Sequence, residues 1–343
     1  MQAIRHQLIK MQAIRVHPSL STPYSPANPA PTSSLHIDTI PIPTPSTGQL
    51  LIQIKATTII RDMLTWPETY AKPYAIPGHD FSGIVSATPP ASKFQIGDEV
   101  FGMAHADRGS TWAQYAIVQE TEVAPKPRIP WAEAAALPLS AQTAYEALFV
   151  HGSLAALAVD QVENQGQEEG QSENVGKRVL VTGAAGGVGI CLVQLAAWAG
   201  AHVVAASSSN GRNEKFLKEL GADEVVEYGS LGGKFDLVVD CVGGKVLESC
   251  WGVVKDEGVL ISVDSASFDF VDLHMKSGIG RENVKALFFI VEGGKALGDL
   301  GQLANRGLLR SFVAASFEFE RIREAYDYAN GRFEGRGKVV LTL

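Results

Sequence analysis

The sequence has few cysteines, no long apolar run and no excess of basic residues. Its three cysteines, Cys191, Cys241 and Cys250, are an odd and scattered set, so we expect reduced core residues rather than a disulfide framework. No apolar run approaches the roughly 20 residues of a membrane-spanning helix. The N-terminal residues lack the charged-then-apolar layout of a secretory signal. Together these absences predict a cytoplasmic protein.

Acidic residues outnumber basic ones, 37 to 29, and the formal net charge is −8. This balance argues against a nucleic-acid partner and against an anionic membrane surface, since both attract basic patches. A chain of 343 residues with 45% hydrophobic residues suits two ordinary globular domains. The composition does not choose between a monomer and a homodimer.

The chain is organised around Lys177–Gly200, where a β-rich run meets a glycine-dense turn and then an apolar segment. Strand, glycine turn and helix in this order indicate a dinucleotide site. Gly186 would let the backbone approach a pyrophosphate at the helix N-terminus, and Gly189 would let the helix pack closely on the strand. Ala184 stands where the strict pattern has its first glycine. A tight turn in some other doubly wound domain is the alternative.

Short apolar runs and helix-forming runs alternate after this turn. We expect strands at 178–182, 201–206, 224–227, 235–241 and 258–263, a possible sixth at 286–291, and a helix at 214–220. Such alternation predicts an α/β fold with a doubly wound parallel sheet, whose ligand lies at the carboxyl ends of the strands.

The end of the second of these strands bears on the choice of cofactor. Enzymes that use NAD place an Asp or Glu there, and it bonds the ribose 2′-hydroxyl. Here the strand leads into Ser207, Ser208 and Arg212, with Lys215 beyond, and no carboxylate stands between 207 and 212. Because hydroxyls and cations suit a 2′-phosphate, we predict NADPH rather than NADH. A solvated polar loop that caps the next helix is the alternative.

The chain before this turn has a different pattern. From Met11 to Arg128, short β segments are cut by prolines and glycines, and Gln49–Ala56 alternates as a half-buried strand does. Further strands are expected at 35–39, 81–86, 99–102 and 115–118. Trp131–Leu148 is helix-forming, with a break at Pro138. We therefore predict a small, closed β domain followed by helices.

Two segments are given no part in the chemistry. MQAIR occurs at 1–5 and again at 11–15, and we interpret Met1–Lys10 as a dispensable extension or an upstream start. Val159–Gly176 is acidic and almost free of apolar residues, so burial cannot offset its ordering entropy. We predict a mobile surface loop there, with a partner-docking segment as the alternative.

Several short motifs follow one another in a specific order. They are Pro77–Gly83 (PGHDFSG), Gly97–Val100 (GDEV), Ala134–Pro138 (AAALP), Ala184–Gly189 (AAGGVG), Leu220–Asp223 (LGAD) and Gly337–Leu341 (GKVVL). With these motifs the chain from Met11 to Leu343 resembles the medium-chain dehydrogenase/reductase superfamily, in its zinc-independent quinone reductase and enoyl reductase branch. The resemblance implies a GroES-like β domain over 11–128 and 292–343, a Rossmann domain over 129–291, and an active site in the cleft between them.

Zinc can be examined by counting ligands. Zinc-dependent members of that family use a Cys before a Gly-His-Glu motif, its His and a later Cys, and hold a structural ion with four clustered Cys. This chain has no Cys before Cys191 and no Cys cluster, so His79 lacks thiolate partners. Because a tetrahedral site needs at least three protein ligands, we predict that no metal is bound.

The resemblance also implies which residues hold the cofactor. The diphosphate would lie on Gly186, Gly187 and Val188, next to Ala185, and Thr143 would reach the nicotinamide ribose. Ser207, Lys215 and Tyr228 would meet the 2′-phosphate, and the residues at the strand end add Ser208 and Arg212 to this set. Val242, Gly243, Phe289 and Val291 would line the adenosine and the nicotinamide. A core aromatic at the end of a strand is the alternative for Tyr228.

Catalytic groups are expected within Thr57–Tyr74. Enoyl reductases of the family have an Asn-Pro-x-Asp stretch followed by a Tyr that is the proposed proton donor. Aligning Asp62 with the family Asp places Tyr70 on the Tyr, and it places Ile59 and Ile60 on Asn-Pro, so the substrate-facing Asn is missing. Tyr70 and Asp62 are the candidate catalytic residues. A loop aromatic that closes the cleft is the alternative for Tyr70.

These inferences together predict an enzyme, an NADPH-dependent reductase that transfers hydride to an activated C=C bond (an enone or enoyl thioester) or to a quinone. Two alternatives stay open. One is a relative that binds NADPH without catalysis, and the other is an auxiliary enoyl reductase that acts on a carrier-bound polyketide.

Overall fold

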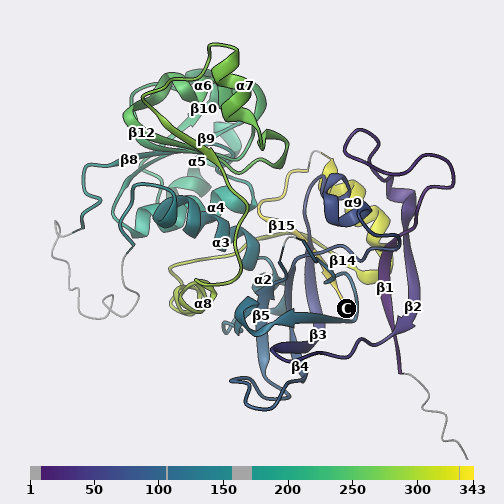
Figure 1. Ribbon diagram of the computed structural model, residues 1–343. Coiled ribbons are helices and arrows are strands. Elements are labelled where there is room, and N and C mark those ends of the chain that lie inside the picture. Colours follow the sequence, from purple (N-terminus) through teal and green to yellow (C-terminus); the bar gives the residue numbers. More distant parts are fainter. Residues whose placement is uncertain (1–8, 106, 157–171, 332) are drawn as a thin grey trace, which may run out of the picture. The chain divides into compact units, whose positions relative to one another are not determined.

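The computed structural model describes residues 9–105, 107–156, 172–331 and 333–343 (Figure 1). The chain forms two compact units. Unit 1 contains the described residues up to Leu139 together with Glu292–Gly301 and Phe312–Leu343, and unit 2 contains those of Ser140–Val291 and Gln302–Ser311. Among the helices of these described ranges, none is both long enough and apolar enough to cross a membrane.

Unit 2 contains a six-stranded parallel sheet in the order β10-β9-β8-β11-β12-β13. Its strands are β8 (Arg178–Val181), β9 (His202–Ser207), β10 (Glu224–Glu227), β11 (Phe235–Asp240), β12 (Val254–Ser262) and β13 (Lys285–Phe288). The strand order reverses between β8 and β11, and this is the point where a doubly wound sheet binds its ligand. The predicted doubly wound parallel sheet is confirmed.

Helices cover both faces of this sheet. They are α4 (Gly187–Trp198), α5 (Asn210–Glu219), α6 (Gly244–Val253) and α7 (Phe270–Lys276). Right-handed crossovers that run in opposite directions along a sheet place α4 and α5 on one face and α6 and α7 on the other (Figure 1). Trp251 of α6 and Phe270 of α7 pack with Leu180 and Val238 of the strands. Apolar contacts of this kind hold the helices on the sheet.

Unit 1 is built mainly from antiparallel strands. A seven-stranded sheet has the order β14-β15-β3-β4-β5-β7, with β6 pairing to β3, and a two-stranded sheet joins β1 to β2. The strands are β1 (Lys10–Val16), β2 (Leu35–Pro41), β3 (Gln49–Ile59), β4 (Asp80–Ala87), β5 (Glu99–Met103), β6 (Tyr115–Gln119), β7 (Val123–Pro125), β14 (Val313–Glu318) and β15 (Lys338–Thr342). One core cluster contains Leu50, Ile52, Phe81 and Val100, all fully buried. The predicted β domain is therefore present.

The remaining helices are α1 (Pro67–Tyr70), α2 (Trp131–Ala135), α3 (Pro138–Tyr145), α8 (Leu297–Asn305) and α9 (Ile322–Asn330). The helical stretch expected from Trp131 does break at Pro138, and α3 continues into a π-helical turn over Glu146–Val150. The Ser82 hydroxyl donates to the Trp131 carbonyl oxygen at 2.7 Å. Ala135 packs with Ala56 and Val340. Contacts of this kind place α2 in unit 1, whereas the domain limits expected from the sequence group it with 129–291.

Several limits differ from those expected. Helix α5 begins at Asn210, four residues before Glu214, and β13 ends at Phe288 rather than Val291. Residues 1–8 of the expected extension and 159–171 of the expected loop lie outside the described residues. The end of that loop is packed, because Asn174 is buried and its Nδ2 donates to the carbonyl oxygens of Ala155 at 2.8 Å and Ala199 at 2.9 Å.

Candidate functional site

The turn between β8 and α4 is made by Gly183, which has a φ of +62°. The expected pattern placed this role at Ala184, where the chain has no glycine. Ala184 instead continues the strand pairing, since its N–H donates to the Ala206 carbonyl oxygen at 3.1 Å. The tight turn is therefore made one residue earlier than the strict pattern has it.

The start of α4 has the geometry of an anion site. Gly186 precedes the helix, is exposed, and donates its N–H to the Gly183 carbonyl oxygen at 2.8 Å. A Cβ added to Gly189 would lie 2.7 Å from Ala184 Cα and closer still to the Gly183 carbonyl oxygen, so the helix packs against the turn as only glycine allows. The first N–H groups of a helix lack intrahelical partners, which leaves those of Gly187 and Val188 able to bind a diphosphate.

A buried carboxylate, which the sequence did not single out, ties the carboxyl ends of the strands together. The side chain of Asp240 ends β11 and accepts hydrogen bonds from the hydroxyls of Thr182 at 2.6 Å and Ser262 at 3.1 Å. It also accepts from the Gly243 N–H at 2.9 Å. Asp240 is fully buried, so it fixes the loops after β8 and β11 rather than binding a ligand itself. The sequence did contain a signal for Asp240, because an acid there ends an apolar run in β11.

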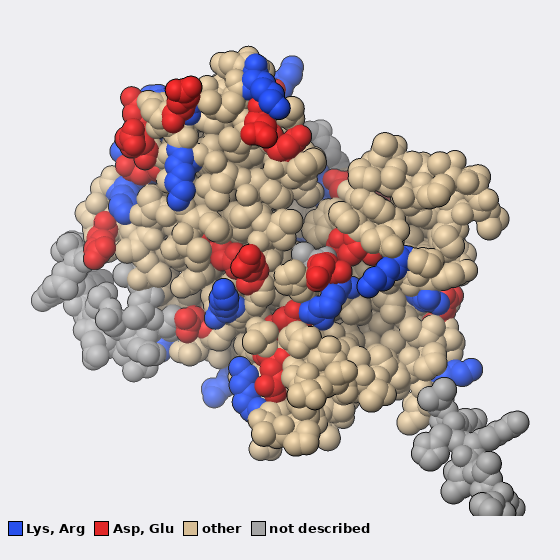
Figure 2. All heavy atoms as spheres, viewed as in Figure 1, with Lys and Arg blue, Asp and Glu red and all other residues tan. Residues whose placement is uncertain are grey.

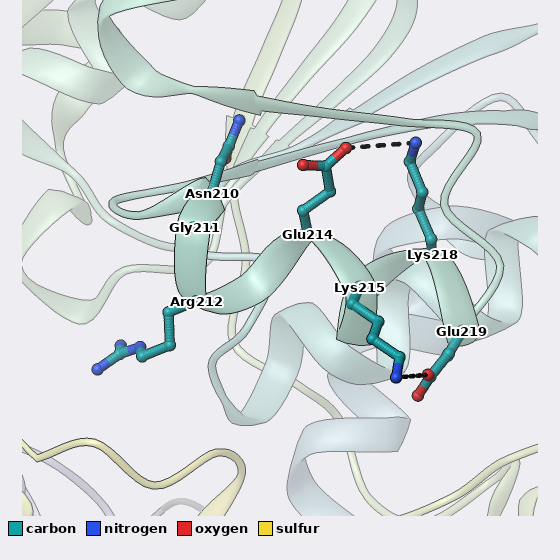
Figure 3. A pocket seen from close by; sticks show the side chains of 7 residues that line it. All are labelled: Asn210, Gly211, Arg212, Glu214, Lys215, Lys218 and Glu219. Carbon is teal, nitrogen blue, oxygen red and sulfur yellow. Dashed lines mark ion pairs between the residues drawn. The ribbon is translucent and has the colours of Figure 1, made fainter.

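Of the residues expected around the 2′-phosphate, Arg212 and Lys215 belong to α5 and extend in different directions from it (Figure 3). Figure 3 shows a surface depression lined only by α5, with Arg212 and Lys215 extending on sides of the helix away from Asn210. Lys215 Nζ lies 3.9 Å from Glu219 Oε1, and the Lys215 side chain is 92% exposed. Ser207 is buried and Ser208 is exposed. Of this set, Ser208 and Arg212 are exposed near the start of α5.

No carboxylate stands between 207 and 212 in the sequence, but the structure brings one to this region from another strand. The Asn210 N–H, at the start of α5, donates to Glu227 Oε1 at 3.1 Å. Glu227 ends β10 and pairs directly with Ser207 at the end of β9. Glu227 therefore belongs to the strand next to β9, and the sequence from 207 to 212 alone gives no sign of it.

Tyr228 bonds to the glycine turn between β8 and α4. Its hydroxyl accepts a hydrogen bond from the Gly183 N–H at 3.2 Å, and its ring packs against the apolar cluster of unit 2. Burial raises the pKa of the Tyr228 hydroxyl above its ordinary value, so it stays protonated at neutral pH. These contacts favour the alternative of a core aromatic at the strand end.

The other residues expected to line the cofactor all lie in unit 2. Thr143 is buried in α3, and Val291 is buried after β13. Val242 is 37% exposed. Gly243 has a φ of +73°, and a Cβ there would lie 2.7 Å from Ser267 Oγ. Phe289 follows β13, and its ring centroid lies 4.4 Å from that of His151. This contact packs the Phe289 ring against His151.

The segment expected to carry the catalytic groups is fixed to α9 within unit 1. The Leu64 N–H donates to the Tyr326 hydroxyl at 3.0 Å, and the Asp62 N–H donates to Asn330 Oδ1 at 2.8 Å. Asp62 is exposed and has a left-handed backbone with a φ of +58°. Asp62 therefore forms a surface turn at the start of the segment. Ile59 is buried in the core.

Tyr70 is the last residue of α1 and is partly exposed. Its hydroxyl makes no hydrogen bond with any residue in the described ranges. The hydroxyl is thus not committed to holding the fold.

Close to Tyr70 on α1 lies a largely buried acid, Glu68, that the sequence did not single out. Glu68 Oε1 lies 3.0 Å from His79 Nε2, and His79 Nδ1 lies 3.1 Å from the Ala104 carbonyl oxygen. Because a carbonyl oxygen only accepts, Nδ1 donates to Ala104, and Nε2 faces the Glu68 carboxyl group. The exposed fractions are 2% for the His79 side chain and 9% for that of Glu68, so the pair holds α1 against the sheet.

The donor set around His79 does not fit zinc. Both ring nitrogens already have partners, and one of these is a backbone carbonyl. Among the described residues, no group of three or more His, Cys, Asp or Glu side chains could hold a metal ion. A tetrahedral site requires more ligands than Glu68 and His79 offer.

The surface charge is mixed. Figure 2 shows acidic and basic side chains interspersed over the described part of the face in view. On this face the described basic side chains lie among acidic ones.

Two family models match the chain. One, described as an alcohol dehydrogenase GroES-like domain, matches residues 46–128, and the other, described as a zinc-binding dehydrogenase, matches 220–341. The first match confirms the GroES-like character of the β domain.

Relatives and solved structures extend this similarity over the chain. A probable zinc-binding mitochondrial oxidoreductase of Arthroderma benhamiae is 36% identical over 331 residues, which cover 91% of this chain and 94% of the relative. A 2-methylene-furan-3-one reductase of Solanum lycopersicum is 33% identical over 287 residues, 78% of this chain and 63% of that protein. The quinone oxidoreductase structure from Coxiella burnetii has the same fold, with a TM-score of 0.78 at 24% identity over 98% of this chain and all of that one. The chain belongs to the medium-chain dehydrogenase/reductase superfamily, in its quinone oxidoreductase-like branch.

Proposed function

We propose that the protein is an NADPH-dependent reductase that transfers hydride to an activated C=C bond or a quinone without zinc. The observation that carries the proposal is the turn from Gly183 to Gly189 at the carboxyl end of β8, which only a close-packed, glycine-lined backbone can form. The choice of acceptor is supported by relatives named as a 2-methylene-furan-3-one reductase and as quinone oxidoreductases.

The chain's own residues have separable tasks in this proposal. The amides of Gly187 and Val188 bind the diphosphate, and Asp240 holds the loops around it. When bound, the reduced nicotinamide supplies the hydride that goes to the electrophilic β-carbon of the acceptor. Tyr70 donates a hydrogen bond to the developing enolate oxygen or a proton to the α-carbon. Asp62 positions the segment through its turn at Asn330.

The choice of NADPH is supported by Ser208 and Arg212, which are exposed at the start of α5. A hydroxyl and a guanidinium both bond well to a phosphate oxygen. Lys215 contributes less, because it points toward Glu219 (Figure 3).

The test is to supply NADPH with a panel of acceptors and to measure turnover as the loss of reduced-nicotinamide absorbance. We expect turnover of a quinone and a conjugated enone with NADPH and, with NADP⁺ in its place, no oxidation of a simple alcohol. Activity only with a carrier-bound enoyl thioester would favour the auxiliary enoyl reductase. Tight NADPH binding with no turnover of any acceptor would favour a non-catalytic relative.

Removing metal is expected to change nothing. Dialysis against a strong chelator should leave both Tm and kcat unaltered, because His79 already has both ring nitrogens engaged. A zinc-dependent alcohol dehydrogenase treated in parallel is the control and should lose activity. Stoichiometric zinc in the purified protein, with loss of turnover on its removal, would contradict the proposal.

A further inference from the structure

The end of β10 carries a carboxylate at the start of α5. Glu227 is the last residue of β10, and Ser207, its direct partner in the sheet, is the last residue of β9. Glu227 Oε1 accepts the Asn210 N–H at 3.1 Å. The negative charge therefore lies just beyond the end of the second strand of the parallel sheet, although that strand itself contributes no acid there.

The position of this carboxylate is held by more than one contact. Asn210 Nδ2 donates to the Val225 carbonyl oxygen of β10 at 3.2 Å, so both the backbone and the side chain of Asn210 bond to that strand. The loop from Ser207 to Asn210 is thereby fixed along β10. Glu227 occupies the place at this helix start where an anion is favoured by the helix dipole.

The lysines of α5 do not offset this charge at the helix start. Lys215 Nζ lies 3.9 Å from Glu219, and Lys218 Nζ lies 3.3 Å from Glu214. Figure 3 shows both pairs along the helix, beyond its first turn. Glu227, in contrast, bonds directly to the first residue of α5.

In a doubly wound sheet, the adenosine ribose of a dinucleotide lies past the end of the second strand, where an acid bonds its 2′-hydroxyl. We propose that Glu227, from the neighbouring strand, performs this role and is a determinant of cofactor choice. Its carboxylate accepts the ribose 2′-hydroxyl of NADH and opposes the 2′-phosphate of NADPH. The inference rests on the proposed nicotinamide cofactor. It adds that Glu227 limits the NADPH preference that Ser208 and Arg212 would otherwise give.

The size of the effect follows from charge. A phosphate monoester carries about −1.5 to −2 charges at neutral pH. Glu227 is exposed, so water and salt screen its repulsion of that phosphate. We expect a change of about tenfold in affinity, equivalent to about 1.4 kcal/mol, and a smaller change at high salt.

The experiment compares Glu227→Gln with the wild type by fluorescence titration of NADPH and NADH. The Kd for NADPH should fall about tenfold in the variant, whereas the Kd for NADH should stay equal or rise. The ratio of the two Kd values should return toward that of the wild type as salt is added. Because the side chain is exposed and Gln keeps an acceptor for the Asn210 N–H, the fold should be unaffected.

Glu219→Gln is the matched control. It removes the same charge from an exposed side chain at the last residue of α5, nine residues beyond Asn210, or about 13 Å along the helix at 1.5 Å per residue. Its Kd ratio should equal that of the wild type. An unchanged ratio in Glu227→Gln, or an equal shift in both variants, overturns the inference while reductase activity stands. Failure of the wild type to bind either cofactor overturns both the inference and the proposed function.

Discussion

Replacing Tyr70 with Phe is expected to lower kcat on a conjugated enone by at least about 10²-fold, the lower end of the range for general acid catalysis. The Phe variant keeps the ring and loses only the hydroxyl. That hydroxyl makes no hydrogen bond within the described ranges, so its removal should not disturb the fold. Because the donor acts in the transition state more than in the bound substrate, the Kd of NADPH should not change. Steady-state kinetics and a cofactor titration measure the two quantities.

The choice of acceptor and a matched variant sharpen this test. With a quinone the loss should be smaller, because a hydroquinone anion is a weak base and water can supply its proton. Tyr328→Phe is the control, since the Tyr328 ring is likewise partly buried in unit 1 and stacks on Phe333 at 5.1 Å. Its kcat should equal that of the wild type. An unchanged kcat for Tyr70→Phe on the enone would mean that Tyr70 only packs and that the proton comes from another source.

The parallel sheet could be predicted because each strand is a short apolar run between breakers. The expected limits of β10, Glu224–Glu227, are those of the structure, and β11 differs by one residue. Strands buried on both faces give continuous apolar runs, and local sequence is enough to show them. The same reasoning found the break at Pro138, because a missing N–H is a local property.

Features that depend on another segment could not be predicted in this way. Helix α5 begins at Asn210, although its first turn is polar, and there the Asn210 N–H bonds to Glu227, 17 residues later. Likewise, Glu68 is an ordinary acid in the sequence until His79 is brought to 3.0 Å from it. A single-strand search for the ribose-binding acid therefore misses Glu227.

The segment around Asp62 shows a further limit. Alignment with a family motif gave Asp62 a catalytic place, yet its left-handed φ of +58° and its bond to Asn330 make it a turn residue in this fold. A motif transfers residue types, but local backbone conformation decides which way a side chain can act. For that reason, the kcat of Tyr70→Phe on an enone is the measurement that decides the role of Tyr70.

Replacing Gly189 with Ala is expected to reduce kcat/KM about 10²-fold through misplacement of the cofactor, and to destabilise the protein by about 1–3 kcal/mol. The added Cβ would lie 2.7 Å from Ala184 Cα and closer still to the Gly183 carbonyl oxygen. Both are backbone atoms, so no side-chain rotation can relieve the contact. Helix α4 must then move away from the turn, and the amides of Gly187 and Val188 move with it. Cofactor titration, kinetics and a thermal melt would measure the effect.

Gly211→Ala is the matched change on the neighbouring helix. A Cβ at Gly211 would meet no atom within 4 Å, and its φ is not positive. Because Ala loses less backbone entropy than Gly in a helix, this variant should gain about 0.5–1 kcal/mol of stability and keep its cofactor affinity. If Gly189→Ala instead behaved like Gly211→Ala, close packing of α4 on the turn would not be what positions the diphosphate. The binding proposal would then depend on the strand ends around Asp240 alone.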